Sequence, residues 1–268
     1  MRSNAQNYLE RLHFKMELVF GMVRRDVLGR YRESLFGLIW SIISPLLMLA
    51  VYTLAFHGLF GARWPGADSS SGFAMMAFVG LILHGLLAEA LIRAPTAISG
   101  QANFVKKLVF PLTVLPMVPL GSALFHAVIS LSVLVVFALI SGTPLHWTAL
   151  LIPIVLLPYM LGLCGLAWAS AAIGVYIRDI VQLGALVSTA FMFLSPVFYP
   201  MSMIPPKYAG LIALNPLTFV IESVRGLMFE GVIPDPWRLA IYTICAALFA
   251  GLGLLIFRRL RPGFGDVL

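Results

Sequence analysis

The sequence predicts an all-α integral membrane protein with six transmembrane helices, an N-terminal amphipathic interface helix and re-entrant helices before the last span. Two observations lead to this prediction. Of the 268 residues, 60% are hydrophobic and only 11% are charged, with a mean hydropathy of +0.97, which no water-soluble domain of this length has. Apolar stretches long enough to cross a bilayer core of roughly 30 Å also recur along the chain.

Six stretches meet this length requirement and together form a predicted transmembrane domain over 35–258. We expect the spans at 35–60, 73–92, 112–140, 147–177, 180–199 and 237–257. The third and fourth stretches are longer than one span needs, so part of each should tilt, kink or lie at an interface. Because proline removes backbone donors, Pro111, Pro116 and Pro119 predict a broken entry into the third span.

The basic residues predict the orientation of these spans. Of the 18 Lys and Arg residues, only Arg63, Lys207, Arg225 and Arg238 lie on one side, and all the others lie on the opposite side. The positive-inside rule therefore places both termini in the cytoplasm, and an even number of spans agrees with it. The same bias explains the pI of about 9.7, so we expect no nucleic-acid partner.

The two ends of the chain are predicted to be cytoplasmic, as an arm over 1–34 and a tail over 259–268. Apolar residues of the arm recur at helical spacing, at Leu9, Leu12, Met16, Val19, Phe20, Val23 and Val27. A basic amphipathic helix of this kind lies along a membrane surface. It either anchors the first span or provides a platform for a soluble partner, and the residues alone leave both interpretations open.

Two segments between the spans have unusual compositions. The polar loop 100–108 lies on the cytoplasmic side, and its composition alone favours an ordinary basic anchor over a helical turn that docks elsewhere. The external segment 200–236 is too apolar for a solvated loop and too rich in proline and charge for a span. We therefore expect two short re-entrant half-helices there, with Glu222 and Arg225 paired three residues apart.

Motifs for catalysis and cofactor binding are absent from the sequence. It contains no G-x-x-x-x-G-K-[ST] phosphate loop, no metal-ligand spacing among its histidines and no Ser/His/Asp set, so we expect neither an enzyme nor a bound cofactor or metal. Cys164 and Cys245 fall inside spans and behave as small apolar residues. Glu89 is the only acidic residue within a predicted span, and Arg93 four residues later favours a self-neutralising pair over a proton-coupling group.

Small residues and aromatic residues each mark particular spans. The stretch LGLCGLAWASAAIG over 161–174 permits close helix contact, and we expect that contact within one chain. Rings and hydroxyls occur on the first span at Trp40, Tyr52 and Phe56, and on one face of the fifth at Ser188, Phe191, Ser195, Phe198 and Tyr199. Such surfaces suit sugars, although rings in membrane helices more often face lipid or the core.

An ordered set of segments resembles one family. The stretch RRDVLGRYRESLFGLIWSIISPLLMLAVYTLAF resembles the start of ABC-type polysaccharide export permeases, the membrane subunits that export lipid-linked O-antigen, capsule or teichoic acid chains. Further matching segments follow in order: NFVKKLVFP, YIRDI, SPVFYPMSMIPPKY, LNPLTFVIESVRGL and FRRLRPGFGDVL. The resemblance covers nearly the whole chain, and the tail and the YIRD turn look more like the O-antigen branch.

This resemblance implies a homodimer in the bacterial inner membrane, with two copies of a cytoplasmic ATPase subunit that binds ATP and Mg. The path for a polyprenyl-linked polysaccharide would run between the protomers, along the rings and hydroxyls of the first and fifth spans. The loop 100–108 would be the coupling helix, and 200–236 would close the external end. The ATPase contacts implied in the coupling helix are Gln101, Asn103, Phe104, Lys106 and Lys107.

Four arginines lie near the cytoplasmic mouth of this implied path. The candidates to receive the pyrophosphate are Arg24, Arg25, Arg30 and Arg32, because guanidinium groups match phosphate oxygens. The excess of basic residues on the cytoplasmic side of membrane proteins also explains their position without any ligand. An exporter of drugs or small lipophilic substrates is an alternative within the same class. An intramembrane sugar transferase or a secondary transporter is disfavoured, because clustered Asp and His residues and buried charges are lacking.

Overall fold

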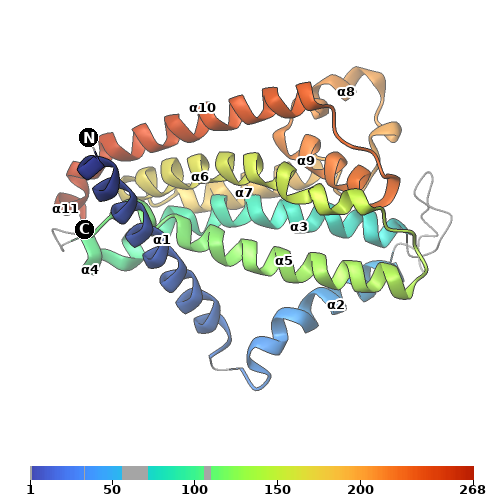
Figure 1. Ribbon diagram of the computed structural model, residues 1–268, viewed down its shortest axis with the longest axis horizontal. Helices are drawn as coiled ribbons and strands as arrows, with labels where there is room; N and C mark the ends of the chain where they lie inside the picture. The colour runs from blue at the N-terminus through green and yellow to red at the C-terminus, as the bar shows by residue number, and fades with distance from the viewer. Residues whose placement is uncertain (1, 33, 56–71, 106–109) are drawn as a thin grey trace.

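The computed structural model describes residues 2–32, 34–55, 72–105 and 110–268, and these ranges are helical, with no strand among them (Figure 1). The predicted all-α membrane fold is confirmed. Phe56, Lys106 and Lys107 lie outside the described residues, as does Arg63.

The helices are α1 (Arg2–Tyr31), α2 (Trp40–Tyr52), α3 (Gly72–Ile92), α4 (Ala102–Val105), α5 (Met117–Ile140), α6 (Ile152–Tyr176), α7 (Ile180–Phe193), α8 (Pro206–Ala213), α9 (Pro216–Arg225), α10 (Pro236–Leu260) and α11 (Phe264–Val267).

Five helical stretches are long and apolar enough to cross a membrane, or up to six if the bent pair α8–α9 counts as one span. They are Gly37–Ala55, Gly72–Thr96, Leu112–Ile140, Trp147–Tyr176 and Pro236–Val267. The prediction of a fifth helix over 180–199 is wrong in its extent, because α7 has 14 residues, a length of about 21 Å. Pro196 explains the early end, since it lacks an N–H and disfavours helical backbone in the residue before it.

The centre of the bundle is α3, of which most side chains are buried, and Figure 1 shows it between α5 and the pair α6–α7. The small residues of 161–174 pack within the chain, as expected. A Cβ added at Gly165 on α6 would lie 2.6 Å from Cα of Ala250 on α10, and one added at Gly253 would collide with the Gly165 carbonyl oxygen. These glycines therefore let α6 and α10 approach at backbone distance.

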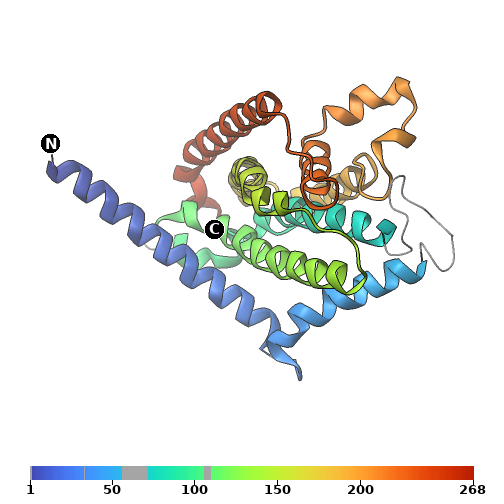
Figure 2. The ribbon, with the colours of Figure 1, turned by 45° about the vertical axis from the view of Figure 1, so that its right-hand side comes forward.

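The C-terminus, α4 and α11 lie at one end of the bundle, and α1 points its N-terminus toward the same end but away from the bundle, whereas α8 lies at the opposite end (Figures 1 and 2). Figure 2 shows α1 running outward from the bundle toward its N-terminus and meeting α2 in a V. The entry to α5 is broken, as the prolines predicted. A short 3-10 turn over Leu112–Val114 precedes the regular helix, which begins at Met117.

The packed face of α1 differs in part from the predicted apolar stripe. Val19, Val23 and Val27 pack inward, but Met16 and Phe20 are 64% and 73% exposed. The buried Met22, which the stripe omitted, takes a place in the core cluster. The inward face of α1 also carries charged side chains that form ion pairs with residues at the end of α3. The spacing of apolar residues alone is therefore not enough to identify this face.

The helices α8 and α9 meet at a bend of 94°, consistent with the expected re-entrant segment. Asn215 caps α9 by accepting a hydrogen bond from the Leu217 backbone N–H at 2.9 Å. The predicted pair of Glu222 and Arg225 is present at 3.0 Å. Arg225, which the sequence assigns to the external side, is the last residue of α9 and is buried, with only 3% exposure.

Candidate functional site: a charge ring, a polar cavity and a coupling segment

Two helices are joined by a closed ring of four charged side chains. Asp26 and Arg30 lie on α1, Glu89 lies on α3, and Arg93 directly follows the last residue of α3. The Arg30 guanidinium donates to Glu89 at 2.9 Å, and Arg93 donates to Glu89 at 3.0 Å. Nη2 of Arg93 donates to Oδ1 of Asp26 at 2.8 Å, and Nε of Arg30 lies 3.7 Å from Oδ2 of Asp26.

This charge ring is electrically neutral and partly buried, with side chains between 19% and 35% exposed. The predicted pair of Glu89 and Arg93 is confirmed. The two partners on α1 were not predicted from the sequence, although Asp26 and Arg30 stand four residues apart in the order that favours a helical ion pair. Because the ring crosses from α1 to α3, it ties the interface helix to the centre of the bundle.

Removing one acid from this ring should loosen α1. We expect Glu89→Gln to leave two arginines facing one carboxylate and to destabilise the protein by about 1.5–3 kcal/mol, the range for hydrogen bonds to charged groups. Thermal unfolding in detergent measures the loss. Asp266→Asn, which changes an exposed carboxyl at the same end of the bundle, is the matched control. Equal unfolding temperatures for wild type, Glu89→Gln and the control would contradict a stabilising role for the ring.

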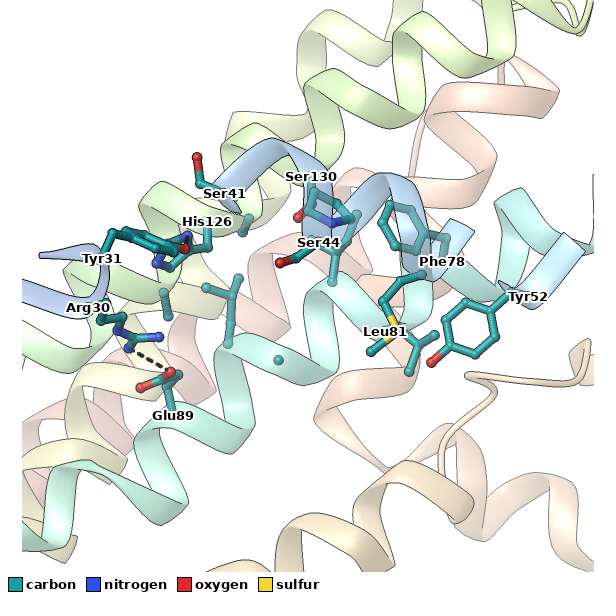
Figure 3. A pocket seen from close by; sticks show the side chains of 17 residues that line it. Arg30, Tyr31, Ser41, Ser44, Tyr52, Phe78, Leu81, Glu89, His126 and Ser130 are labelled. Atoms are coloured by element: carbon teal, nitrogen blue, oxygen red, sulfur yellow. Dashed lines mark hydrogen bonds and ion pairs between the residues drawn. The ribbon is translucent and has the colours of Figure 1, made fainter. Parts of the chain in front are cut away.

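A cavity of about 400 Å³ lies beside the charge ring, between the V of α1 and α2 and the helices α3 and α5 (Figure 3). Its wall mixes charged groups, hydroxyls, an imidazole and rings. The labelled residues are Arg30 and Tyr31 from α1, Ser41, Ser44 and Tyr52 from α2, Phe78, Leu81 and Glu89 from α3, and His126 and Ser130 from α5. Such a wall offers both hydrogen bonds and ring faces to a ligand that carries hydroxyls.

Two of these side chains meet at one end of the cavity (Figure 3). The Tyr31 hydroxyl lies 3.4 Å from His126 Nδ1, and the two rings meet edge-on with centroids 5.8 Å apart. Burial raises the pKa of Tyr31 against the opposing effect of Arg30, so its hydroxyl stays protonated at neutral pH. His126 Nε2 is buried and has no hydrogen-bond partner within the described part of the chain.

The structure places the predicted path residues in different surroundings. Tyr52 lines the cavity, and its ring lies 6.4 Å from that of Phe198. Trp40 does not line the cavity and instead meets Phe36 edge-on at 5.8 Å. Phe191 faces a separate groove between α6, α7 and α10. Among the described rings of the predicted path, the fold thus brings Tyr52 and Phe198 together.

The predicted serines use their hydroxyls inside the chain. Ser188 is buried, with its Oγ 3.3 Å from Nε2 of His84. The Ser195 hydroxyl donates to the Phe191 carbonyl at 2.5 Å and accepts from the Asn215 amide at 2.9 Å. The expectation that the five residues share one helical face is wrong, because α7 ends at Phe193 and Tyr199 turns back to donate to the Phe193 carbonyl at 2.8 Å.

The predicted coupling loop forms a 3-10 turn over Ser99–Gln101 followed by α4. Asn103 is exposed. Phe104 is half-buried and turns toward its own chain, where its ring lies 4.5 Å from Phe110 and packs on the cluster that holds α1 and Phe264. Gln101 Oε1 is buried without a described partner. Through Phe104, the described part of the loop is thus attached to the cluster that also holds residues of α1 and of the C-terminal segment.

The four predicted pyrophosphate arginines divide into two groups. Arg30 is held by the two carboxylates of the charge ring. Arg24, Arg25 and Arg32 are exposed, and none of them forms an ion pair with a described residue. An anionic ligand at this end would therefore meet these three side chains before it met Arg30.

Membrane-length helices, a bent re-entrant pair and a cavity of mixed polarity define a multi-pass membrane protein. A family model described as ABC-2 type transporter matches residues 17–229, so the chain belongs to the ABC-2 transporter permease family. Among its relatives, the O-antigen export system permease protein RfbA of Myxococcus xanthus is 28% identical over 251 residues, which is 93% of this chain and 94% of that protein.

Two further relatives carry similar names. The O-antigen export system permease protein RfbA of Klebsiella pneumoniae is 26% identical and covers 96% of this chain and 97% of its own length. The polysialic acid transport protein KpsM of Escherichia coli is 24% identical, with 86% of this chain and 89% of that protein covered. The resemblance to polysaccharide export permeases is therefore confirmed, and these relatives are named as transport proteins rather than enzymes.

Proposed function

We propose that this chain is the membrane subunit of an ATP-driven exporter of lipid-linked polysaccharide, most directly O-antigen. The observation that carries the proposal is the nearly end-to-end similarity to O-antigen export permeases from two bacteria. A capsular polysaccharide is the second candidate, supported by the similarity to the polysialic acid transport protein. The substrate passes from the cytoplasmic to the outer side of the inner membrane.

The working unit in this proposal is a homodimer with two cytoplasmic ATPase subunits, which bind the ATP and Mg. The position of the C-terminus and α4 at one end, toward which α1 points its N-terminus, supports a cytoplasmic position for that end, as does the excess of basic residues in the segments assigned to it. The three exposed arginines Arg24, Arg25 and Arg32 receive the pyrophosphate there. Arg30 is excluded from this role because its charge is already neutralised by Glu89 and Asp26.

Contacts within the chain provide a route for the ATPase motion. The segment 99–105 packs through Phe104 on a cluster that includes Met22 of α1. The charge ring then ties α1 to α3. Movement of the ATPase subunits thus reaches α1 and the V beside the cavity, where Tyr52 offers a ring face to passing sugars and Phe198 supports that ring from outside the cavity wall.

Deletion of the gene, followed by complementation, tests the proposed substrate. We expect the deletion strain to lose surface O-antigen and to accumulate the lipid-linked polymer inside the cell, and we expect the intact gene to restore export. Loss of capsule with normal O-antigen would assign the second candidate. Normal surface polysaccharide of both kinds would contradict the proposed function.

A bulky substitution at Asn103 tests the coupling segment. Because Asn103 is exposed, Asn103→Trp should leave the fold intact but block the groove of the ATPase subunit. We expect export and co-purification of the ATPase to fall about tenfold or more, the effect of losing about 1.4 kcal/mol of interface energy. Asp266→Trp, at another exposed position of the same end, is the control. An equal loss in both variants, or no loss in either variant, would contradict the proposal that this segment contacts the ATPase subunit.

A further inference from the structure

A second cavity, distinct from the polar one, forms a groove of about 1220 Å³ between α6, α7 and α10, with α9 along one side. This volume exceeds the roughly 300–1,000 Å³ of pockets for drug-sized molecules. Most of its wall is apolar and includes Leu163 and Leu166 on α6 and Phe191 on α7. On one side Phe219 of α9 stacks on Tyr242 of α10 with ring centroids 4.8 Å apart. Its size and apolar wall suit a hydrocarbon chain.

The length of the groove matches half a membrane. Its wall on α10 extends from Arg238 to Phe249. At 1.5 Å per residue this interval measures about 16 Å, close to half of a bilayer core of roughly 30 Å. The groove therefore fits the acyl chain of a lipid in one leaflet, the leaflet at the α8–α9 end of the bundle.

One end of the groove carries an excess of acidic groups. Glu222 pairs with Arg225 at 3.0 Å, and Asp235 lies 3.8 Å from Arg238. Glu230 also lines the groove and forms no ion pair with any residue that the structure describes. Because the acids outnumber their basic partners, this mouth attracts a cation and repels an anionic pyrophosphate.

A buried hydroxyl on the wall independently indicates a ligand. Thr218 lines the groove with a side chain that is only 4% exposed. Its Oγ1 has no hydrogen-bond partner among the described residues. A buried hydroxyl without a partner is unfavourable, so a polar group of a ligand at this point would remove the penalty.

We propose that the groove binds one phospholipid whose headgroup ends in a primary ammonium, such as phosphatidylethanolamine. The acyl chain lies along α10, and the ammonium is attracted by Glu230 at the acidic mouth. Arg238 and Thr218 offer donors to the phosphate and ester oxygens. A primary ammonium carries three N–H donors for carboxylate oxygens, whereas the quaternary ammonium of phosphatidylcholine carries none.

The free thiol of Cys245 lines the groove and is exposed, so it can report on the lipid. In a Cys164→Ala chain, a fluorophore on Cys245 is reconstituted into nanodiscs with brominated-acyl phosphatidylethanolamine or phosphatidylcholine at equal mole fraction. We expect relative quenching to favour phosphatidylethanolamine about two- to fivefold, the factor that one partly exposed ion pair gives. Glu230→Gln should remove this preference.

A label on the outer face of the same helix gives the matched control. Leu248→Cys, in a chain without the two native thiols, places the fluorophore at a position that is 70% exposed and outside the groove wall, and there the two lipids should quench equally. Equal quenching at Cys245, or a preference unchanged by Glu230→Gln, would overturn the proposal. Stronger quenching by a brominated polyprenyl pyrophosphate would also overturn the proposal, because it would indicate that the groove binds the lipid carrier of the transported polysaccharide. None of these readouts requires transport, so failure here leaves the proposed exporter function standing.

Discussion

Arg225→Ala is expected to cause a large loss of stability. The Arg225 guanidinium donates to the Met76 carbonyl at 2.7 Å, the Pro196 carbonyl at 2.6 Å and the Val197 carbonyl at 2.9 Å. It also pairs with Glu222. These contacts join α3, the break after α7 and α9 at one point, so alanine would leave several buried carbonyls and one carboxylate without a donor.

We expect this substitution to lower the free energy of unfolding by about 3–5 kcal/mol, because several buried carbonyls would lose hydrogen bonds from a charged donor, each worth about 1.5–3 kcal/mol. The midpoint of thermal unfolding in detergent should fall by on the order of 10 °C. Arg225→Lys should recover only part of the loss, because an ammonium cannot reproduce the guanidinium fork.

Arg238→Ala is the matched control for this prediction. Arg238 lies at the same end of the bundle, is 79% exposed and reaches Asp235 only at 3.8 Å. Its removal should change the free energy of unfolding by less than about 1 kcal/mol, as for other exposed pairs. Indistinguishable unfolding midpoints for the two alanine variants would show that the buried contacts of Arg225 do not stabilise the re-entrant segment.

Gly253→Leu is expected to separate α6 from α10. A Cβ at Gly253 would collide with the carbonyl oxygen of Gly165, which is a backbone atom and cannot rotate away as a side chain could. The helices must therefore move apart, and we expect a destabilisation of about 3 kcal/mol, near the upper end for overpacked cores. Thermal unfolding and the fraction of monodisperse protein after gel filtration measure the effect.

The same helix supplies a control two residues away. A Cβ added at Gly251 would meet no atom within 4 Å, so Gly251→Leu should leave the unfolding midpoint nearly unchanged. Because leucine forms helix more readily than glycine, a small stabilisation is also compatible with the prediction. Equal losses for the two leucine variants would mean that the close approach at Gly253 does not determine stability.

Much of the fold could be predicted from local patterns. The length of the apolar stretches predicted the membrane helices, and the prolines of the third stretch predicted its broken entry. Spacing of three or four residues predicted the pairs Glu222–Arg225 and Glu89–Arg93. These features were predictable because each depends on residues that lie within one turn of helix or within one span.

Contacts between distant segments decided the rest. The sequence by itself determined that the chain is a helical membrane protein of the polysaccharide-permease type and where most of its helices lie. Only the tertiary structure brought Asp26 and Arg30 to Glu89, buried Arg225 against three carbonyls and opened the groove beside α10. The reason is physical: in a bilayer, apolar length specifies that a segment spans, but the same apolar residues suit lipid and core equally. Polar pairing and close backbone contact across the bundle therefore select which face turns inward.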